Sequence, residues 1–101
     1  SRSVTILGST GSVGCNTVEL IEKNLEQFTI EALTANRNIQ LLADQARRLK
    51  PKTAVLADPE GYQELKDALA GTGIHVAAGA DAIIEAQVKE IAEMKLLLAD
   101  I

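Results

Sequence analysis

Short apolar runs alternate along this chain with longer segments in which apolar residues recur at helical spacing. The apolar runs predict strands over residues 3–7, 28–34, 53–57 and 74–77, with a further short strand at 95–98. The helical spacing predicts helices over about 13–24, 39–49, 58–70 and 81–93. Strands and helices that alternate in this way favour a parallel sheet with helices packed on its faces.

Individual residues indicate where these elements begin and end. Asn38 is placed to cap the second helix, and Pro51 follows its end. Asp58 and Asp81 are placed as caps of the third and fourth helices, and Pro59 takes a first-turn position where proline is tolerated. The apolar side of the first helix is expected to contain Val18, Leu20 and Ile21, and that of the second Leu41, Leu42, Ala46 and Leu49.

Glycines at positions 8, 11 and 14 connect the first predicted strand to the first predicted helix. Gly8 permits a tight turn, Gly11 leaves room for a pyrophosphate against the backbone, and Gly14 lets the helix pack close to the strand. Amides of residues 10–13 would point at the phosphates, where the helix dipole favours negative charge. This setting predicts a dinucleotide site in a Rossmann-like α/β fold, a three-layer parallel sheet with helices on both faces.

The spacing of these glycines leaves a second interpretation open. Gly-x-x-Gly-x-x-Gly differs from the commoner Gly-x-Gly-x-x-Gly, so the pattern is also compatible with a glycine-rich turn that binds no ligand. No Gly-Lys-Ser/Thr follows the loop, which disfavours a phosphate loop of the nucleoside-triphosphatase kind.

The residues after the second predicted strand, Asn36, Arg37 and Asn38, include a cation and no acid. An NAD site usually places a carboxylate there for the ribose 2′-hydroxyl, whereas an NADP site places an arginine near the 2′-phosphate. Glu31 lies inside the predicted strand, too early in the chain to reach the ribose. The pattern therefore favours NADP, with the Arg37 guanidinium on the phosphate. The alternative makes Arg37 a solvated surface charge and Asn38 only a helix cap.

Two stretches, LGSTGSVGCNT at residues 7–17 and EALTANRN at 31–38, closely resemble the N-terminal part of 1-deoxy-D-xylulose 5-phosphate reductoisomerases, and the likeness covers about residues 3–86. These enzymes use NADPH to convert 1-deoxy-D-xylulose 5-phosphate into 2-C-methyl-D-erythritol 4-phosphate, in the non-mevalonate route to isoprenoids. The resemblance implies cofactor-phosphate contacts by Thr10, Gly11, Ser12 and Val13, and binding of the adenosine 2′-phosphate end by Asn36, Arg37 and Asn38. Many relatives have Gly-Lys-Asn at the latter positions, so this chain keeps the cation. A divalent metal, Mg²⁺ or Mn²⁺, holds the substrate in the full-length enzymes.

The chain departs from this family in length and in its last residues. Family members are several times longer, and their metal carboxylates and substrate ligands lie in a catalytic domain to which no residue here corresponds. From about Gln87 the likeness fades. We therefore expect residues 1–101 to form a truncated NADPH-binding domain, with no catalytic or metal-binding residue and no turnover on its own.

Two alternatives from other classes stay open. The first is a non-catalytic or engineered α/β scaffold or assembly protein that retains the dinucleotide fingerprint without using it. The second is another NADP-dependent family with the same glycine spacing, such as the aspartate-semialdehyde dehydrogenases, which residues 34–38 disfavour. A preference for NADPH over NADH would separate a cofactor-binding domain from a scaffold.

Composition narrows the expected partners and location. A net charge of −4 and an aromatic content of 2% argue against a nucleic-acid surface. No apolar run is long enough to cross a bilayer, and the first residues lack the apolar stretch of a secretory signal. The single cysteine, Cys15, excludes an internal disulfide, fits a cytoplasmic location and is expected to pack rather than to react. An incomplete parallel sheet exposes an apolar edge or face, so we expect homo-oligomers.

Overall fold

The structure is a computed structural model that describes residues 2–91 of the chain. Its strands are β1 (Arg2–Ile6), β2 (Phe28–Ala35), β3 (Thr53–Leu56) and β4 (His75–Ala78). Its α-helices are α1 (Ser12–Glu22), α2 (Ile39–Leu49), α3 (Tyr62–Ala68) and α4 (Ala80–Ile91), with short 3-10 helices at Leu25–Gln27 and Pro59–Gly61. The predicted order of elements is confirmed within this range, and the strand predicted at 95–98 lies outside the described residues.

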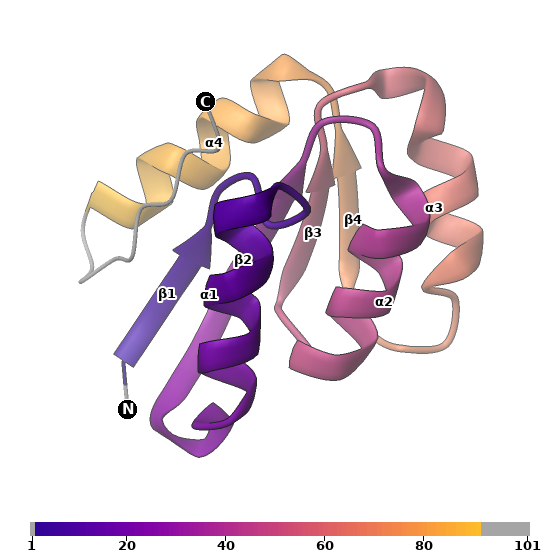
Figure 1. Cartoon of the computed structure of the whole chain (residues 1–101). Helices are drawn as coiled ribbons and strands as arrows, with labels where there is room; N and C mark the ends of the chain where they lie inside the picture. The colour runs from indigo at the N-terminus through magenta and orange to yellow at the C-terminus, as the bar shows by residue number, and fades with distance from the viewer. Residues whose placement is uncertain (1, 92–101) are drawn as a thin grey trace.

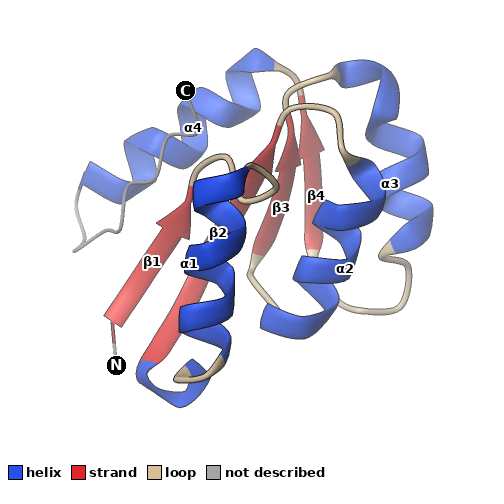
Figure 2. Ribbon diagram, in the orientation of Figure 1, coloured by secondary structure: helices blue, strands red, loops and turns tan. Residues whose placement is uncertain are grey.

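The strands form one parallel sheet in the order β1-β2-β3-β4. The helices α1, α2 and α3 cover one face of this sheet, and α4 covers the other (Figure 1, Figure 2). The first three helices share a face because each connects a strand to its next neighbour by a crossover of the same hand. In contrast, α4 runs back across the sheet from β4 toward β1. The predicted three-layer fold with helices on both faces is therefore confirmed.

The main hydrophobic core lies between the sheet and the first three helices. It is aliphatic and includes Val4, Ile6, Leu33 and Leu56 from the strands, and Val18, Leu42 and Leu65 from the helices. A smaller cluster under α4 contains Ala32, Val55 and Ala86. Neighbouring positions of a strand point to opposite faces, which explains why Thr5 lines the α4 side between two residues of the main core. One face of the sheet thus carries most of the apolar burial.

A β-bulge at Glu31 interrupts the pairing of β1 with β2. Val4 pairs with Ile30, and the next residue of β1 pairs with Ala32, so Glu31 has no partner residue on β1. The Glu31 carboxylate lies 2.9 Å from the Lys52 ammonium. An extra residue of this kind bends the strand and re-aims the side chains beside it. Glu31 therefore lies inside the strand, as the sequence predicts, and its carboxylate is engaged far from the strand's carboxyl end.

Two predictions about helix faces and caps are wrong. Leu20, expected on the apolar side of α1, is 64% exposed. The buried residues of α1 recur at helical spacing and leave Leu20 beside the stripe; they are Gly14, Thr17, Val18 and Ile21. Asp81 lies inside the first turn of α4 rather than capping it, because the helix already begins at Ala80, directly after Gly79 with its positive φ of 102°.

The third predicted helix is divided into two pieces. Asp58 accepts a 3.0 Å hydrogen bond from the Glu60 amide, so it is a cap as predicted, but it caps the 3-10 helix rather than α3. The helix α3 begins only at Tyr62, after Gly61. Gly61 is buried, and a Cβ there would lie 2.4 Å from a leucine side chain of β3. The turn at Gly61 therefore packs closely against β3 and leaves no room for a side chain there.

Candidate dinucleotide-binding site

Two glycines, one in the β1–α1 loop and one in the first turn of α1, are required by the local backbone shape. Gly8 has a positive φ of 69°, a conformation that favours glycine, and it turns the chain out of β1. Gly14 packs so closely that a Cβ there would lie 2.1 Å from the Gly8 carbonyl oxygen and 2.7 Å from the Ser9 Cα. The roles predicted for these two residues are confirmed. Gly11 has a φ of −76° and a ψ of 176°, which other residues also adopt, so its role beside a pyrophosphate stays a prediction.

The N-terminus of α1 is exposed beside this loop. Gly11 is its N-cap residue; the Gly11 amide donates to the Gly8 carbonyl at 3.1 Å, and the Gly11 carbonyl accepts from the Cys15 amide at 2.8 Å. The amides of Ser12 and Val13 begin the helix, where backbone donors have no acceptor one turn earlier within it. Both residues are exposed, and the first turn contains no acidic side chain. This end of α1 therefore offers N–H donors and the positive end of a helix dipole to an anion.

Thr34 and Gln45 hold the glycine loop from neighbouring elements. The Gly8 amide donates to the Thr34 Oγ1 at 3.0 Å, and the Ser9 amide donates to the Thr34 carbonyl at 2.8 Å. The Gln45 Nε2 donates to the Ser9 carbonyl at 2.8 Å. Sequence reasoning missed both residues. For Gln45 a signal was available, because it is a polar residue on the otherwise apolar stripe of α2, and a buried amide must find a hydrogen-bond partner.

The β2–α2 loop carries Asn36, Arg37 and Asn38, all of them exposed. The Asn38 Oδ1 accepts a 3.1 Å hydrogen bond from the Leu41 amide, which confirms the predicted cap of α2. The Asn36 carbonyl accepts a 3.0 Å hydrogen bond from the Asp58 amide, so the loop is also anchored to the segment that follows β3. These two contacts fix the backbone on both sides of Arg37.

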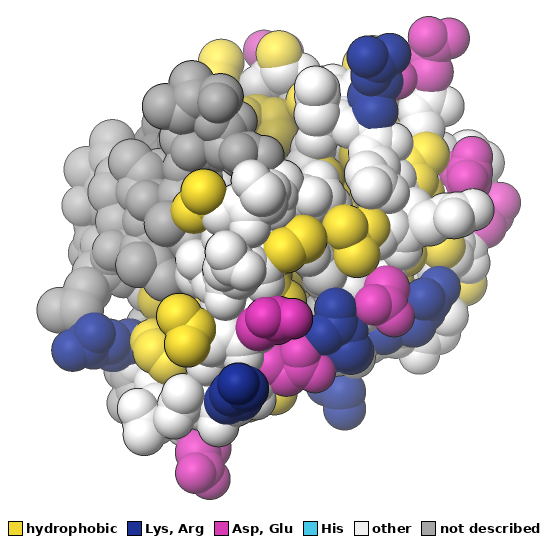
Figure 3. Space-filling model, in the orientation of Figure 1, with side chains coloured by type: hydrophobic (Ala, Val, Ile, Leu, Met, Phe, Trp, Pro, Cys, Tyr) yellow, Lys and Arg dark blue, Asp and Glu magenta, His cyan; other side chains and the backbone are white. Residues whose placement is uncertain are grey.

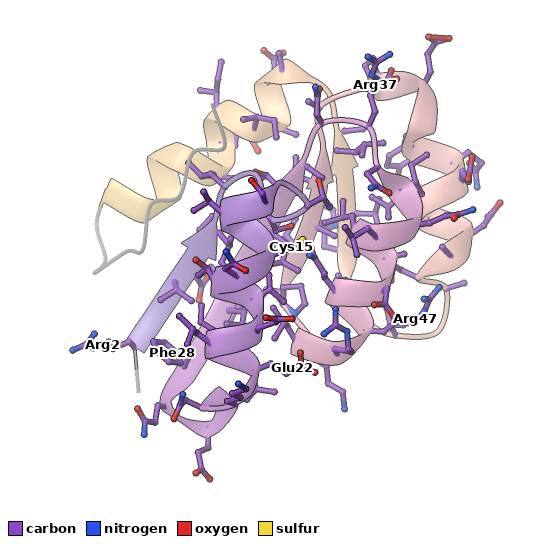
Figure 4. All side chains as sticks on the ribbon, viewed as in Figure 1. Arg2, Cys15, Glu22, Phe28, Arg37 and Arg47 are labelled. Atoms are coloured by element: carbon purple, nitrogen blue, oxygen red, sulfur yellow. The ribbon has the colours of Figure 1, made fainter. Side chains whose placement is uncertain are left out.

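Arg37 differs from the two arginines of α2. Arg47 donates a 3.0 Å hydrogen bond to a carbonyl of α3, and Arg48 forms ion pairs with Glu22 and Asp44. Arg37 makes no ion pair and no side-chain hydrogen bond with the residues whose side chains the structure describes, 2–86. Figure 4 shows Arg37 at the end of the molecule that carries the β2–α2 loop, well apart from Glu22 and Arg47. A guanidinium without a carboxylate partner is available to an external anion.

The glycine loop and the β2–α2 loop lie at the same edge of the sheet (Figure 1). In a parallel sheet all strands end at one edge, and each of these loops directly follows a strand end. The Ser9 amide bonds to the carbonyl of Thr34, near the end of β2, so the two loops are also joined by a hydrogen bond. The structure therefore brings residues 10–13 and 36–38, which the sequence predicts to contact one cofactor, to a common edge.

Four further features bear on function: the Cys15 thiol, metal-binding groups, membrane-spanning helices and surface charge. The Cys15 thiol is half-buried, 3.6 Å from the Thr10 carbonyl oxygen and 3.8 Å from the Gln45 amide nitrogen. Among the side chains of residues 2–86, no group of three His, Cys, Asp or Glu is placed to hold a metal ion. No helix in the described part of the chain has the length and apolar character needed to cross a membrane. Figure 3 shows acidic and basic side chains intermixed on the visible face rather than gathered in one basic patch.

The sequence profile of the family described as 1-deoxy-D-xylulose 5-phosphate reductoisomerase matches residues 4–100. The chain belongs to this family. The enzyme of that name from Rhodospirillum centenum is 64% identical over 85 residues, and that from Zymomonas mobilis is 56% identical over 85 residues; each alignment covers 84% of this chain. Because the alignments cover 22% of the Zymomonas protein and 21% of the Rhodospirillum protein, the chain spans about one-fifth of the length of these relatives.

Solved structures of the family share the fold. The 1-deoxy-D-xylulose 5-phosphate reductoisomerase from Zymomonas mobilis in complex with NADPH has a TM-score of 0.83 at 56% identity, over 84% of this chain and 22% of that chain. A DOX-P reductoisomerase in complex with NADPH, fosmidomycin and magnesium has a TM-score of 0.78 at 29% identity, over 84% of this chain and 21% of that chain. The resemblance stated from the two sequence motifs is therefore confirmed, and so is the Rossmann-like fold.

Proposed function

We propose that this chain is the N-terminal, NADPH-binding part of a 1-deoxy-D-xylulose 5-phosphate reductoisomerase. Such an enzyme rearranges and reduces 1-deoxy-D-xylulose 5-phosphate to 2-C-methyl-D-erythritol 4-phosphate in isoprenoid biosynthesis. Family membership and the NADPH complex of the Zymomonas mobilis relative support this proposal. The observation that carries it is Arg37, a guanidinium with no acidic partner among the side chains of residues 2–86, on the loop next to an exposed helix N-terminus.

The residues of the two loops fit the chemistry of NADPH. The pyrophosphate would lie at the N-terminus of α1, where the contacts come from Thr10, Gly11, Ser12 and Val13. The 2′-phosphate would lie on the β2–α2 loop, where the contacts come from Asn36, Arg37 and Asn38. The guanidinium presents paired N–H donors that match two phosphate oxygens, and the backbone contacts on either side of it hold the loop in place. When bound, NADPH supplies the hydride for the reduction.

We propose that the catalytic residues of the family lie outside this chain. A family structure contains magnesium together with NADPH, and no cluster of described side chains in the range 2–86 is placed to hold a metal ion. We propose that residues 1–101 form the cofactor-binding domain alone, without catalytic or metal-binding residues. The substrate and metal sites would then belong to the part of the relatives that the chain does not match. We propose a cytoplasmic location as well, because a single cysteine and no internal disulfide fit a reducing compartment.

Comparison of NADPH with NADH tests the proposal, since the two differ only in the 2′-phosphate. Titration calorimetry of the purified chain should show NADPH binding that is tighter than NADH binding. Arg37→Ala should weaken NADPH binding by about 10- to 100-fold, the equivalent of ~1.5–3 kcal/mol for a charge-assisted hydrogen bond. The same substitution should leave NADH affinity within about twofold.

Arg2→Ala is the matched control for this experiment. It removes the same charge from an exposed position at the start of β1, which lies at the opposite edge of the sheet from the two loops. NADPH affinity should stay unchanged in this variant. Equal and undetectable binding of both cofactors by a chain that is folded by circular dichroism would reject the proposal and favour the non-catalytic scaffold.

We further propose that the chain forms homo-oligomers. A cavity of about 430 Å³ lies between the sheet and α4, with the apolar residues Ala32, Val55 and Ala77 among those that line it. Ile84 on α4 also lines this cavity and is 55% exposed. A partly covered apolar face of this kind favours association. Sedimentation equilibrium over a range of concentrations should detect dimers or larger species, and a monomer at every concentration would contradict the proposal.

A further inference from the structure

Gln45 is a polar residue at a buried position where an apolar side chain would be expected. Its side chain is 1% exposed, and the other buried residues of α2 are Leu42, Ala43, Ala46 and Leu49. A buried amide loses its hydrogen bonds to water, and this loss is recovered only if the protein supplies partners. An apolar side chain of similar length would fill the same space without that requirement. The presence of an amide at this position therefore needs a reason other than packing.

The Gln45 amide contacts the glycine loop at both of its ends. Its Nε2 donates a 2.8 Å hydrogen bond to the Ser9 carbonyl, directly after the turn out of β1. The same nitrogen lies 3.8 Å from the Cys15 Sγ, in the first turn of α1. One side-chain nitrogen thus contacts the start of the loop and the start of the helix that follows it.

The hydrogen bonding around this contact is incomplete inside the protein. The Gln45 Oε1 and the Ser9 Oγ are both buried, and neither makes a hydrogen bond within the described part of the chain. A partly satisfied polar network is less stable than an apolar core. The geometry therefore indicates that the amide serves the position of the loop more than the stability of the fold.

The helix that contains Gln45 directly follows the loop with the predicted 2′-phosphate site. Asn38 is the N-cap of α2, and Arg37 precedes it. The hydrogen bond from Gln45 to Ser9 therefore connects the glycine loop to the helix that directly follows the proposed 2′-phosphate site. The distance between these two groups must match the distance between the pyrophosphate and the 2′-phosphate of one NADPH molecule.

We propose that Gln45 is a positioning residue that sets the glycine loop at the correct distance from Arg37 for both ends of NADPH to bind together. This inference rests on the proposed function. Gln45 does not touch the cofactor; it acts through the Ser9 carbonyl. Its loss should weaken binding at the pyrophosphate end and leave the 2′-phosphate end intact.

Gln45→Met tests this inference, because methionine keeps the length of the side chain and removes both polar atoms. NADPH affinity should fall by about tenfold, the effect of one lost loop contact. Adenosine 2′-monophosphate, which has the 2′-phosphate and no pyrophosphate, should bind within about twofold of the wild type in an NMR titration. The midpoint of urea unfolding should remain close to that of the wild type. Gln63→Met is the matched control, since Gln63 is exposed on α3 and should change neither affinity.

Amide hydrogen exchange gives a readout that does not depend on any cofactor. The Gly11 amide, which donates to the Gly8 carbonyl inside the loop, should exchange about tenfold faster in Gln45→Met than in the wild type. Unchanged exchange would overturn the inference, as would NADPH and adenosine 2′-monophosphate affinities that fall in parallel or an NADPH affinity that stays the same. If the wild type binds no NADPH, the proposed function fails, and the exchange rates still decide whether Gln45 orders the loop.

Discussion

The amide of Gly8 donates a 3.0 Å hydrogen bond to the hydroxyl of Thr34, a residue 26 positions later in the sequence. The carbonyl of Thr34 accepts a second hydrogen bond, of 2.8 Å, from the Ser9 amide. The end of β2 therefore holds the loop that follows β1, and the shape of the glycine loop depends on a strand to which it is not adjacent in sequence. The conformation of the loop can therefore be tested by substituting a residue of β2 and leaving the loop residues unchanged.

Thr34→Val removes the hydroxyl and keeps the branched shape that suits a strand. The Gly8 amide then loses its acceptor in a part-buried position, which should lower the free energy of unfolding by ~1–3 kcal/mol. Urea denaturation measures this change. Thr53→Val is the control, because the Thr53 hydroxyl makes no hydrogen bond with the residues whose side chains are described, 2–86. Equal stabilities of the two variants would contradict the role assigned to Thr34.

Gly14→Ala tests the close packing of α1 against the loop. Helix propensity alone would make alanine more stable than glycine by ~0.5–1 kcal/mol. The added Cβ would lie 2.1 Å from the Gly8 carbonyl oxygen, a backbone atom that cannot move away without distorting the turn. We therefore expect a net loss of ~1–3 kcal/mol in thermal or urea unfolding, together with loss of NADPH binding.

Asn16→Ala provides the comparison for that variant, since Asn16 is exposed on the same helix. It should show only the small gain from helix propensity. If Gly14→Ala were as stable as Asn16→Ala, the steric role of Gly14 would be rejected.

Asn38→Asp separates the two roles of Asn38, the cap of α2 and the predicted contact with the 2′-phosphate. Asparagine and aspartate are nearly equivalent N-caps, so the unfolding midpoint should hardly change. The new carboxylate repels a phosphate, so NADPH affinity should fall by about tenfold while NADH affinity stays the same. Calorimetric titration with both cofactors measures the difference.

Gln27→Glu adds the same charge at an exposed position just before β2, at the opposite edge of the sheet. NADPH affinity should be unaffected there. A parallel loss in both variants would show that net charge, rather than a local phosphate site, governs binding.

Much of the fold follows from short-range patterns. The apolar runs predicted the strands to within one or two residues, and the bounds of α2 agree with the sequence prediction, because Asn38 and Pro51 define its ends locally. Where the predictions failed, the outcome depended on packing. Leu20 is apolar but lies beside the buried stripe of α1, and the third helix begins with a 3-10 piece whose last residue, Gly61, packs against β3.

The candidate site also combines features that follow from local sequence with features that depend on packing. The sequence predicts cofactor contacts at residues 10–13 and 36–38, because a loop with glycine at set positions and a cation after the second strand are local features. It did not indicate that Arg37 lacks an ion pair among the described residues while Arg48 has two partners, since ion pairs depend on which helices lie side by side.

The sequence by itself determined where the strands, the helices and the two loops lie, because periodicity, caps and the backbone freedom of glycine act over a few residues. Only the tertiary structure decided that Thr34 and Gln45 hold the glycine loop. Their hydrogen bonds join residues 26 and 36 positions apart, and such contacts exist only once β2 and α2 have packed beside the end of β1.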